Sequence, residues 1–195
     1  MTTSPVPRLF TFAGGSSGPW RIEQTRTVVG EPLPPAAALG IEATGVVAAG
    51  AGDPASTGDA VWRLRGIVSN ERYVERAEKD ALVAKQEGLG RPACTRAALI
   101  PVRKNAAWWV LKQDERRQVF EAQSQHIAIG LRYLPAIARR LHHCRDLGPD
   151  EPFDFLTWFE FTPGDADAFE DLVGQLRASP EWRFVEREVD LRLTR

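Results

Sequence analysis

The chain has few cysteines and no long apolar run, and both shortages exclude classes of protein. Only two of its 195 residues are cysteines, Cys94 and Cys144, and they lack the paired spacing of a zinc site or a disulfide framework. Two such residues are typical of free thiols in a reducing compartment. No apolar stretch approaches the roughly 18 residues that a membrane-spanning helix needs, and residues 1–8 do not resemble a signal peptide. We therefore expect a cytoplasmic protein with no membrane partner.

An excess of charge of one sign is also missing. The sequence has 25 lysines and arginines against 26 acidic residues, with a net charge of −1. A chain so balanced has no general attraction for nucleic acid or for an anionic membrane surface. Any affinity for an anion must therefore come from individual side chains. The 43% hydrophobic content suits a packed core.

The stretch from Lys104 to Arg139 contains the residues most suggestive of chemistry. Residues 112–129 carry no glycine or proline and have apolar side chains at helical spacing, which predicts a helix that Gly130 can end. His126 lies seven residues after Val119, so both share the inward face. On one unbroken helix His126 and Arg139 would stand about 20 Å apart. A break near Gly130 allows the two side chains to serve one site.

Two interpretations of this pair remain open from spacing alone. A neutral imidazole is a common axial ligand of haem iron, and a guanidinium opposite it would suit an anionic substrate. In the alternative, His126 is a hydrogen-bonded core histidine and Arg139 is a surface cation. The adjacent His142 and His143 have no carboxylate or cysteine at ligand spacing, so we expect a solvated pair and not a metal site.

Hydrophobic periodicity predicts an alternation of strands and helices. We expect strands at 9–13, 20–29, 62–68, 95–102, 153–161 and 184–193, and helices at 71–86, 112–129 and about 169–176. Residues 30–59, rich in Ala, Gly and Pro, predict a long loop. The second half has the strand and helix order of a split βαβ, ferredoxin-like unit. We predict an α+β fold with two such halves, 1–95 and 96–195, whose antiparallel sheets close into a barrel with helices outside.

The strand predicted at 153–161 has two distinct faces. Phe153, Phe155, Phe159 and Phe161 alternate onto one face, while Leu156, Trp158 and Glu160 point the other way. A carboxylate on a face with leucine and tryptophan is a candidate buried acid that needs a partner.

From about residue 60 onward, the chain resembles the chlorite dismutase family of haem b proteins. The resemblance is carried by an ordered set of residues: Lys104, Trp108, Trp109, His126, Arg139 and the segment 155–160, together with residues 69–73 and Gln86. Trp158 stands where the family pattern has tyrosine. The family fold is a dimeric α+β barrel of two ferredoxin-like halves, which agrees with the prediction from periodicity. The resemblance is to the short, cytoplasmic members and implies a homodimer.

The resemblance implies a role for each residue of the set. His126 would be the proximal iron ligand, Glu160 would accept its Nδ1 hydrogen, and Lys104 would keep Glu160 ionised. Arg139 would be the distal residue, posed by Gln86. The remaining implied contacts are packing beside the haem by Trp108 and Trp109, a site wall or interface at Trp158, and the haem propionates at Asn70 and Tyr73.

The activity implied is haem-dependent decomposition of chlorite, a small anion, to chloride and dioxygen. Two alternatives remain. One is another activity of the same superfamily, coproheme decarboxylation or a peroxidase-like reaction; decarboxylating relatives lack the distal arginine, so Arg139 favours chlorite. The other is a non-haem barrel that binds a small ligand or another protein, which the absence of a Soret band would reveal.

Overall fold

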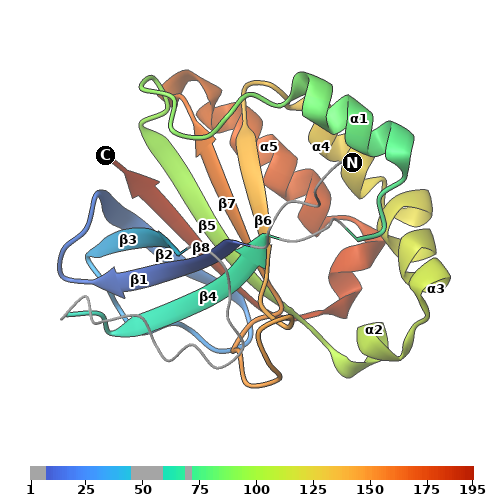
Figure 1. Cartoon of the computed structure of the whole chain (residues 1–195), viewed down its shortest axis with the longest axis horizontal. Helices are drawn as coiled ribbons and strands as arrows, with labels where there is room; N and C mark the ends of the chain where they lie inside the picture. Colours follow the sequence, from blue (N-terminus) through green and yellow to red (C-terminus); the bar gives the residue numbers. More distant parts are fainter. Residues whose placement is uncertain (1–7, 45–58, 69–71) are drawn as a thin grey trace.

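Antiparallel strands form a closed barrel in the computed structural model, which describes residues 8–44, 59–68 and 72–195 (Figure 1). Around the barrel the strands follow the order β1-β3-β2-β8-β5-β7-β6-β4. Their bounds are Arg8–Gly15 (β1), Trp20–Val29 (β2), Ala38–Thr44 (β3), Trp62–Val68 (β4), Arg96–Lys104 (β5), Ala138–His143 (β6), Phe155–Phe161 (β7) and Val185–Thr194 (β8). The predicted α+β barrel is confirmed.

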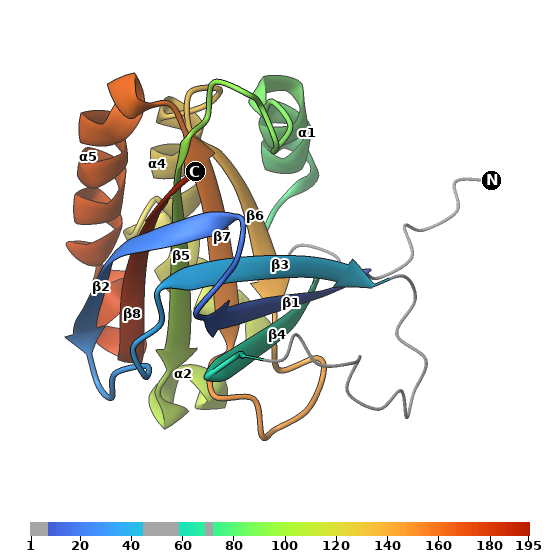
Figure 2. The same ribbon diagram turned by 90° about the vertical axis from the view of Figure 1, so that its left-hand side faces the viewer.

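The helices lie outside the barrel, as predicted. They are α1 (Arg76–Lys85), α2 (Ala106–Val110), α3 (Gln113–Arg117), the π-helix η1 (Gln118–Gln123), α4 (His126–Arg132), α5 (Ala166–Arg177) and the 3-10 helices η2 (Pro163–Asp165) and η3 (Pro180–Phe184). Figure 2 shows α4 between α5 and α1, on the side of β5, β7 and β6 that faces away from β1 to β4. Among the described residues, no helix is long and apolar enough to span a membrane.

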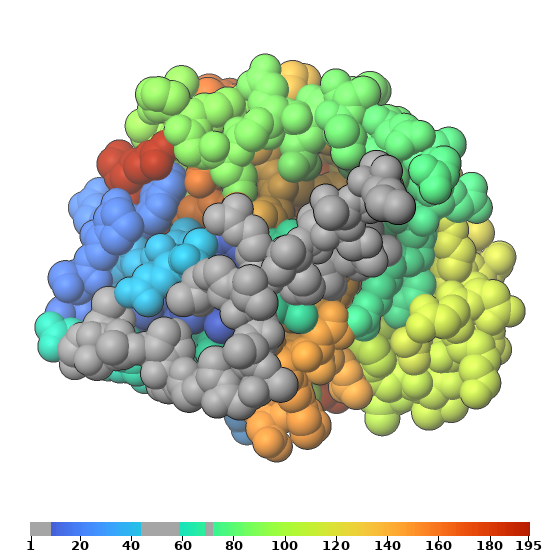
Figure 3. Space-filling view, viewed as in Figure 1, coloured from blue at the N-terminus to red at the C-terminus, as the bar shows by residue number. Residues whose placement is uncertain are grey.

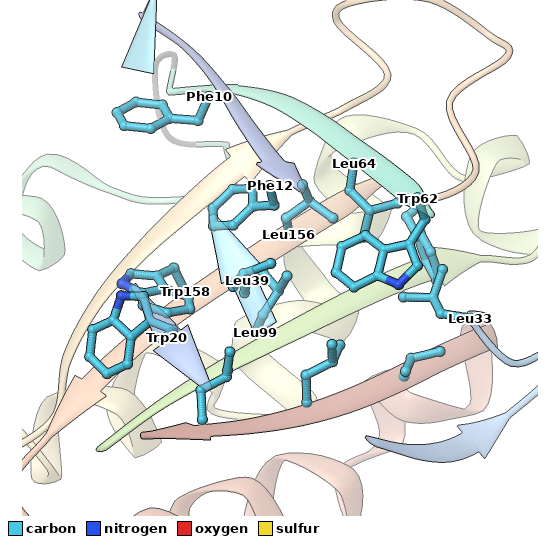
Figure 4. Close-up of a cluster of buried hydrophobic side chains, with 14 of the residues drawn as sticks. Phe10, Phe12, Trp20, Leu33, Leu39, Trp62, Leu64, Leu99, Leu156 and Trp158 are labelled. Carbon is cyan, nitrogen blue, oxygen red and sulfur yellow. The ribbon is translucent and has the colours of Figure 1, made fainter. Parts of the chain in front are cut away.

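Strands β5 and β7 separate two apolar clusters. Their inward side chains, such as Leu99, Leu156 and Trp158, fill the barrel together with Phe12 and Leu39 (Figure 4). Their outward side chains, Ala98, Ile100, Phe159 and Phe161, pack against the apolar face of α5, formed by Phe169, Leu172, Val173 and Leu176. The alternation follows from the two-residue period of a strand, and each fully buried large apolar side chain contributes roughly 1.5–3 kcal/mol.

The segment 30–59 does not form one long loop. β3 lies within it and pairs with β1 along seven residues and with the start of β2. Ala and Gly have low strand propensity, but Leu39 is fully buried in the barrel core, and this tertiary packing outweighs the local preference. Residues 45–58 lie outside the described residues.

The single helix predicted over 112–129 is wrong, because the chain breaks just before His126. Gln125 adopts the left-handed conformation, with φ of 52°, and α4 begins at the next residue. The carboxylate of Glu121 accepts hydrogen bonds from the backbone N–H groups of Ile127 (2.7 Å) and Ala128 (3.3 Å). This carboxylate satisfies donors that a new helix leaves open. Gly130 lies inside α4 and does not end it.

The prediction of a solvated histidine pair is also wrong. His142 and His143 belong to β6 and are both buried. His142 lies inside the barrel against the rings of Phe10 and Phe12, and its Nδ1 donates to the carbonyl of Leu156. Both cysteines are buried free thiols, as expected.

Candidate functional site

A cavity of about 340 Å³ lies between the outer face of the sheet and the helices that cover it. The side chains of Ile100, Thr157 and Phe159 line it from the sheet, and those of Leu82 and Ile127 line it from α1 and α4. In Figure 3, residues of α1 and of the segment that follows it (green to light green) cover the upper edge of the molecule, and the segment from α2 to η1 (yellow-green to yellow) covers its right-hand edge. The cavity has the size and the mainly apolar walls of a small-molecule or cofactor site.

His126, the first residue of α4, lines this cavity. Its Nδ1 lies 2.8 Å from Oε2 of Glu181, and its ring stacks on Phe120 at a centroid distance of 4.3 Å. A carboxylate that accepts the Nδ1 hydrogen fixes both the tautomer and the orientation of the ring. Nε2 is then the nitrogen that can bind a metal.

Lys104 completes a buried chain of charges behind His126. Its Nζ donates to the other carboxylate oxygen of Glu181 at 2.7 Å, and the side chains of both residues are 5% exposed or less. Burial alone would raise the pKa of Glu181, but the electrostatic interactions and hydrogen bonds with His126 and Lys104 outweigh it and lower the pKa to about 2. Glu181 is therefore ionised at neutral pH. The lysine also lies 4.9 Å above the centroid of the Trp108 ring, a cation–π distance.

Glu160 does not have the role that the family resemblance implied. Its carboxylate accepts hydrogen bonds from Nε1 of Trp158 (2.9 Å) and from the backbone N–H of Gly90 (2.6 Å). Glu160 and Trp158 share the inward face of β7, whereas His126 lies on a helix over the outward face. The partner of both His126 and Lys104 is Glu181, which was missed from the sequence. Its only local signal is a charged residue between Pro180 and Trp182.

Arg139 lines the same cavity as His126, from β6. The structure therefore brings together two residues that are 13 positions apart in the sequence. The guanidinium lies directly against the backbone of Gly130 in α4. Gln86, the C-cap of α1, donates from its Nε2 to the backbone carbonyl of Arg139 at 3.0 Å. Gln86 thus contacts Arg139, as expected, but its side chain binds the backbone of Arg139 and not the guanidinium.

The predicted aromatic residues Trp108 and Trp109 lie outside the lining of the cavity. Trp108 packs with Tyr73 and Phe184 in a separate cluster behind Lys104. Trp109 stacks on Phe155, with the guanidinium of Arg145 3.9 Å from its ring centroid. None of these side chains belongs to the described lining of the cavity.

Trp158 and Tyr73 do not line the cavity either. Trp158 does not form a wall of the cavity, because its side chain lies in the barrel core beside Phe12 and Trp20. Tyr73 does not face the cavity, and its hydroxyl accepts a hydrogen bond from Arg116 at 3.1 Å. Asn70 lies outside the described residues.

The residues present fit a haem. One imidazole, held from behind by an ionised carboxylate, faces a largely apolar cavity, which is the donor set of a haem with one protein ligand. His143 also lines the cavity, and its Nδ1 is buried without a hydrogen-bond partner in the described part of the chain. Buried polar atoms normally have partners, so a ligand with polar groups would satisfy this nitrogen. Arg139 also lines the cavity, as does Arg72, whose guanidinium is paired with Asp146.

Comparisons of the chain with a family model, a curated protein and solved structures find chlorite dismutases each time. The family model described as chlorite dismutase matches residues 55–195. A chlorite dismutase from Ideonella dechloratans is 35% identical over 88 residues, which span 45% of this chain but only 28% of that protein. Among solved structures, dimeric chlorite dismutase from Nitrobacter winogradskyi is 56% identical, with 95% of this chain and 99% of that chain covered and a TM-score of 0.83.

A more distant solved structure shares the fold. Chlorite dismutase from Candidatus Nitrospira defluvii in complex with imidazole is 19% identical, with 100% of this chain and 93% of that chain covered and a TM-score of 0.68.

Proposed function

This chain belongs to the chlorite dismutase family, and we propose that it binds haem b through His126 and decomposes chlorite to chloride and dioxygen. The observation that carries the proposal is the meeting of His126 and Arg139 in one apolar cavity, from a helix and a strand respectively. This arrangement offers a metal ligand and a permanent cation for an anionic substrate within a single site.

On the metal-ligand side, each residue has a defined task. Bound haem would supply the redox-active iron on which the decomposition of chlorite depends. Glu181 accepts the Nδ1 hydrogen of His126, which makes the imidazole a stronger electron donor. Lys104 keeps Glu181 ionised despite its burial, and the backbone N–H of Glu181 donates to Oγ of Ser124 at 2.9 Å, which fixes the backbone of Glu181.

On the substrate side, Arg139 attracts and holds the anion. A guanidinium stays protonated at any relevant pH, and in a cavity with apolar walls its field is weakly screened. The same charge keeps anionic reaction partners inside the cavity until chloride and dioxygen form. Gln86 holds the backbone of Arg139 and so supports its position.

We also propose that the protein is a homodimer. The support is the dimeric chlorite dismutase from Nitrobacter winogradskyi, which matches nearly the whole chain at 56% identity.

Dioxygen release from added chlorite, followed with an oxygen electrode, tests the proposal. Arg139→Ala should keep the Soret band but lower the rate of dioxygen release about 100-fold or more, and its haem should bleach sooner. Arg132→Ala is a matched control, because this arginine of α4 does not line the cavity and hydrogen-bonds to Gln175. Dioxygen release from Arg139→Ala as fast and as lasting as from the parent would refute this role of Arg139.

The ligand assignment has its own test in the same assay. His126→Ala should lose haem, because the only proposed iron ligand is removed, and the Soret absorbance per chain measures this loss. Normal haem occupancy in that variant would show that the iron is held elsewhere.

A further inference from the structure

We propose that Gly130 is a positioning residue for Arg139, and that its missing side chain sets where the cation stands in the cavity. This inference rests on the proposed function, in which Arg139 holds an anion. Gly130 lies in α4 four residues after His126, so it is about one helical turn away and on the same face of the helix. Gly130 is buried.

The guanidinium occupies the space that a side chain at residue 130 would need. A Cβ built on Gly130 would lie 2.0 Å from Nη1 of Arg139 and 2.8 Å from both its Cζ and its Nη2. Contacts shorter than 3.0 Å are essentially never made by real Cβ atoms. Any larger residue at this position therefore forces the guanidinium to move by at least about 1 Å.

Backbone conformation does not explain the glycine. Among the described glycines only Gly30 and Gly90 have positive φ, and Gly130 has a helical backbone that any residue could adopt. Glycine is a poor helix former compared with alanine. The space needed by Arg139 is therefore the structural reason for a glycine here.

The position of Arg139 thus depends on two elements, β6 and α4. On one side, β6 fixes the backbone of Arg139 by pairing with Phe159 of β7 and through the hydrogen bond from Gln86. On the other side, the bare backbone of Gly130 lets the charge lie close to the helix that carries His126. A displacement of 1 Å in a positioned group can lower a reaction rate about 100-fold. A methyl group at residue 130 would therefore weaken the binding of an anion by Arg139.

The experiment is a double-mutant cycle on the haem-loaded, full-length chain. Fluoride, a simple anion that accepts hydrogen bonds, is titrated into the ferric parent, Gly130→Ala, Arg139→Ala and the double variant, and binding is followed by absorption. We expect Gly130→Ala to raise the Kd about 10-fold or more, within the range expected for a lost or distorted charged hydrogen bond. In the Arg139→Ala background the same change should have no effect. Gly174→Ala in α5 is the matched control, because a Cβ there meets nothing within 4 Å.

Thermal unfolding of the same four proteins gives a second readout that does not need fluoride. Gly130→Ala should raise the Tm when residue 139 is alanine, because alanine is the better helix former. It should raise the Tm less when Arg139 is present, because the guanidinium, the far end of a flexible side chain, must then move away from the methyl group.

Each possible failure has a distinct signature. Parent-like fluoride binding by Gly130→Ala, or an equal loss in both backgrounds, would overturn the role of Gly130. Loss of haem from Gly130→Ala alone would overturn it too, because the glycine would then serve the cofactor. If Arg139→Ala binds fluoride like the parent, the proposed role of Arg139 fails instead. If the parent takes up no haem, the proposed function fails, while the unfolding cycle still tests the contact between residues 130 and 139.

Discussion

Glu181 contacts His126 and Lys104 through its two carboxylate oxygens, at 2.8 Å and 2.7 Å. The three side chains form one unit, in which the lysine stabilises the carboxylate and the carboxylate polarises the imidazole. Removing the negative charge of Glu181 affects both partners. Lys104 is left as a buried cation without its counter-charge, and His126 loses the carboxylate that polarises it. Breaking one side of a buried ion pair typically costs about 3–5 kcal/mol.

Glu181→Gln should therefore change both stability and redox behaviour. We expect the free energy of unfolding to fall by about 3 kcal/mol, measured by urea denaturation. The haem reduction potential should rise, because a less electron-rich imidazole favours the ferrous state, and spectroelectrochemistry measures this shift. Glu160→Gln is the matched control and should leave the potential unchanged. A shift with Glu160→Gln and none with Glu181→Gln would restore the role implied for Glu160 by the resemblance.

Sequence reasoning could place Glu160 but could not find Glu181. The two-residue period correctly puts Leu156, Trp158 and Glu160 on one face of β7, and that face lies inside the barrel. This alternation already separates Glu160 from the outward face that borders the cavity. Glu181 lies in a short 3-10 helix, 55 residues from His126, where no periodic pattern connects the two.

The helix that carries His126 is short and depends on a cap from the preceding segment. α4 has only seven residues, too few to be stable by propensity alone. The carboxylate of Glu121 accepts hydrogen bonds from two of its first backbone N–H groups. The position of the imidazole therefore depends on a side chain in η1.

Glu121→Ala should loosen this helix and weaken haem binding. We expect a loss of about 1 kcal/mol in unfolding free energy, as for other helix caps, and a higher Kd for haem in a Soret titration. Glu115→Ala is the control, because Glu115 caps α3 through the backbone N–H of Lys112, away from the cavity. It should cost similar stability but leave haem affinity unchanged. Equal haem affinity in both variants would mean that the cap does not position His126.

At the element scale, prediction succeeded where local pattern and packing agree. The amphipathic pattern of α5 and the bounds of β2 could be predicted because their own residues determine them. The break before His126 could not, because it depends on Gln125 in a left-handed conformation and on the reach of Glu121. β3 was missed because Ala38 and Gly40 suggest a loop, and only pairing with β1 makes the segment a strand.

Closure of the barrel joins segments far apart in the sequence. β2 pairs with β8, and β4 meets β6 through the bridge between Ile67 and His143. His142 of β6 lies against two phenylalanine rings of β1. Burial, together with the charge of Arg140, lowers the pKa of His142 to about 3, and burial with the charge of Arg72 lowers that of His143 to about 4.

These buried histidines should make the whole fold sensitive to acid. Both pKa values are lower in the folded state than the ordinary 6.5, so the unfolded chain binds more protons between pH 6.5 and about 4. Stability should therefore fall as the pH drops below 6.5, by up to about 1.4 kcal/mol per pH unit for each histidine. Urea unfolding between pH 4.5 and 7.5 measures this slope. His142→Gln should flatten it; an unchanged slope would show that His142 is not a source of the acid sensitivity.

The alternation along β5 and β7 also means that the packed barrel interior and the walls of the cavity are built from opposite faces of the same two strands. Replacing Ile100, Thr157 or Phe159 alters the walls around a ligand, while their neighbours Leu99, Leu156 and Trp158 remain in the barrel interior. Because Ile100 and Phe159 also pack against α5, a combinatorial library of the outward positions that keeps apolar side chains at these two residues could redesign substrate preference on an intact framework. The same fold could in this way host new reactions through changes at a handful of alternate residues.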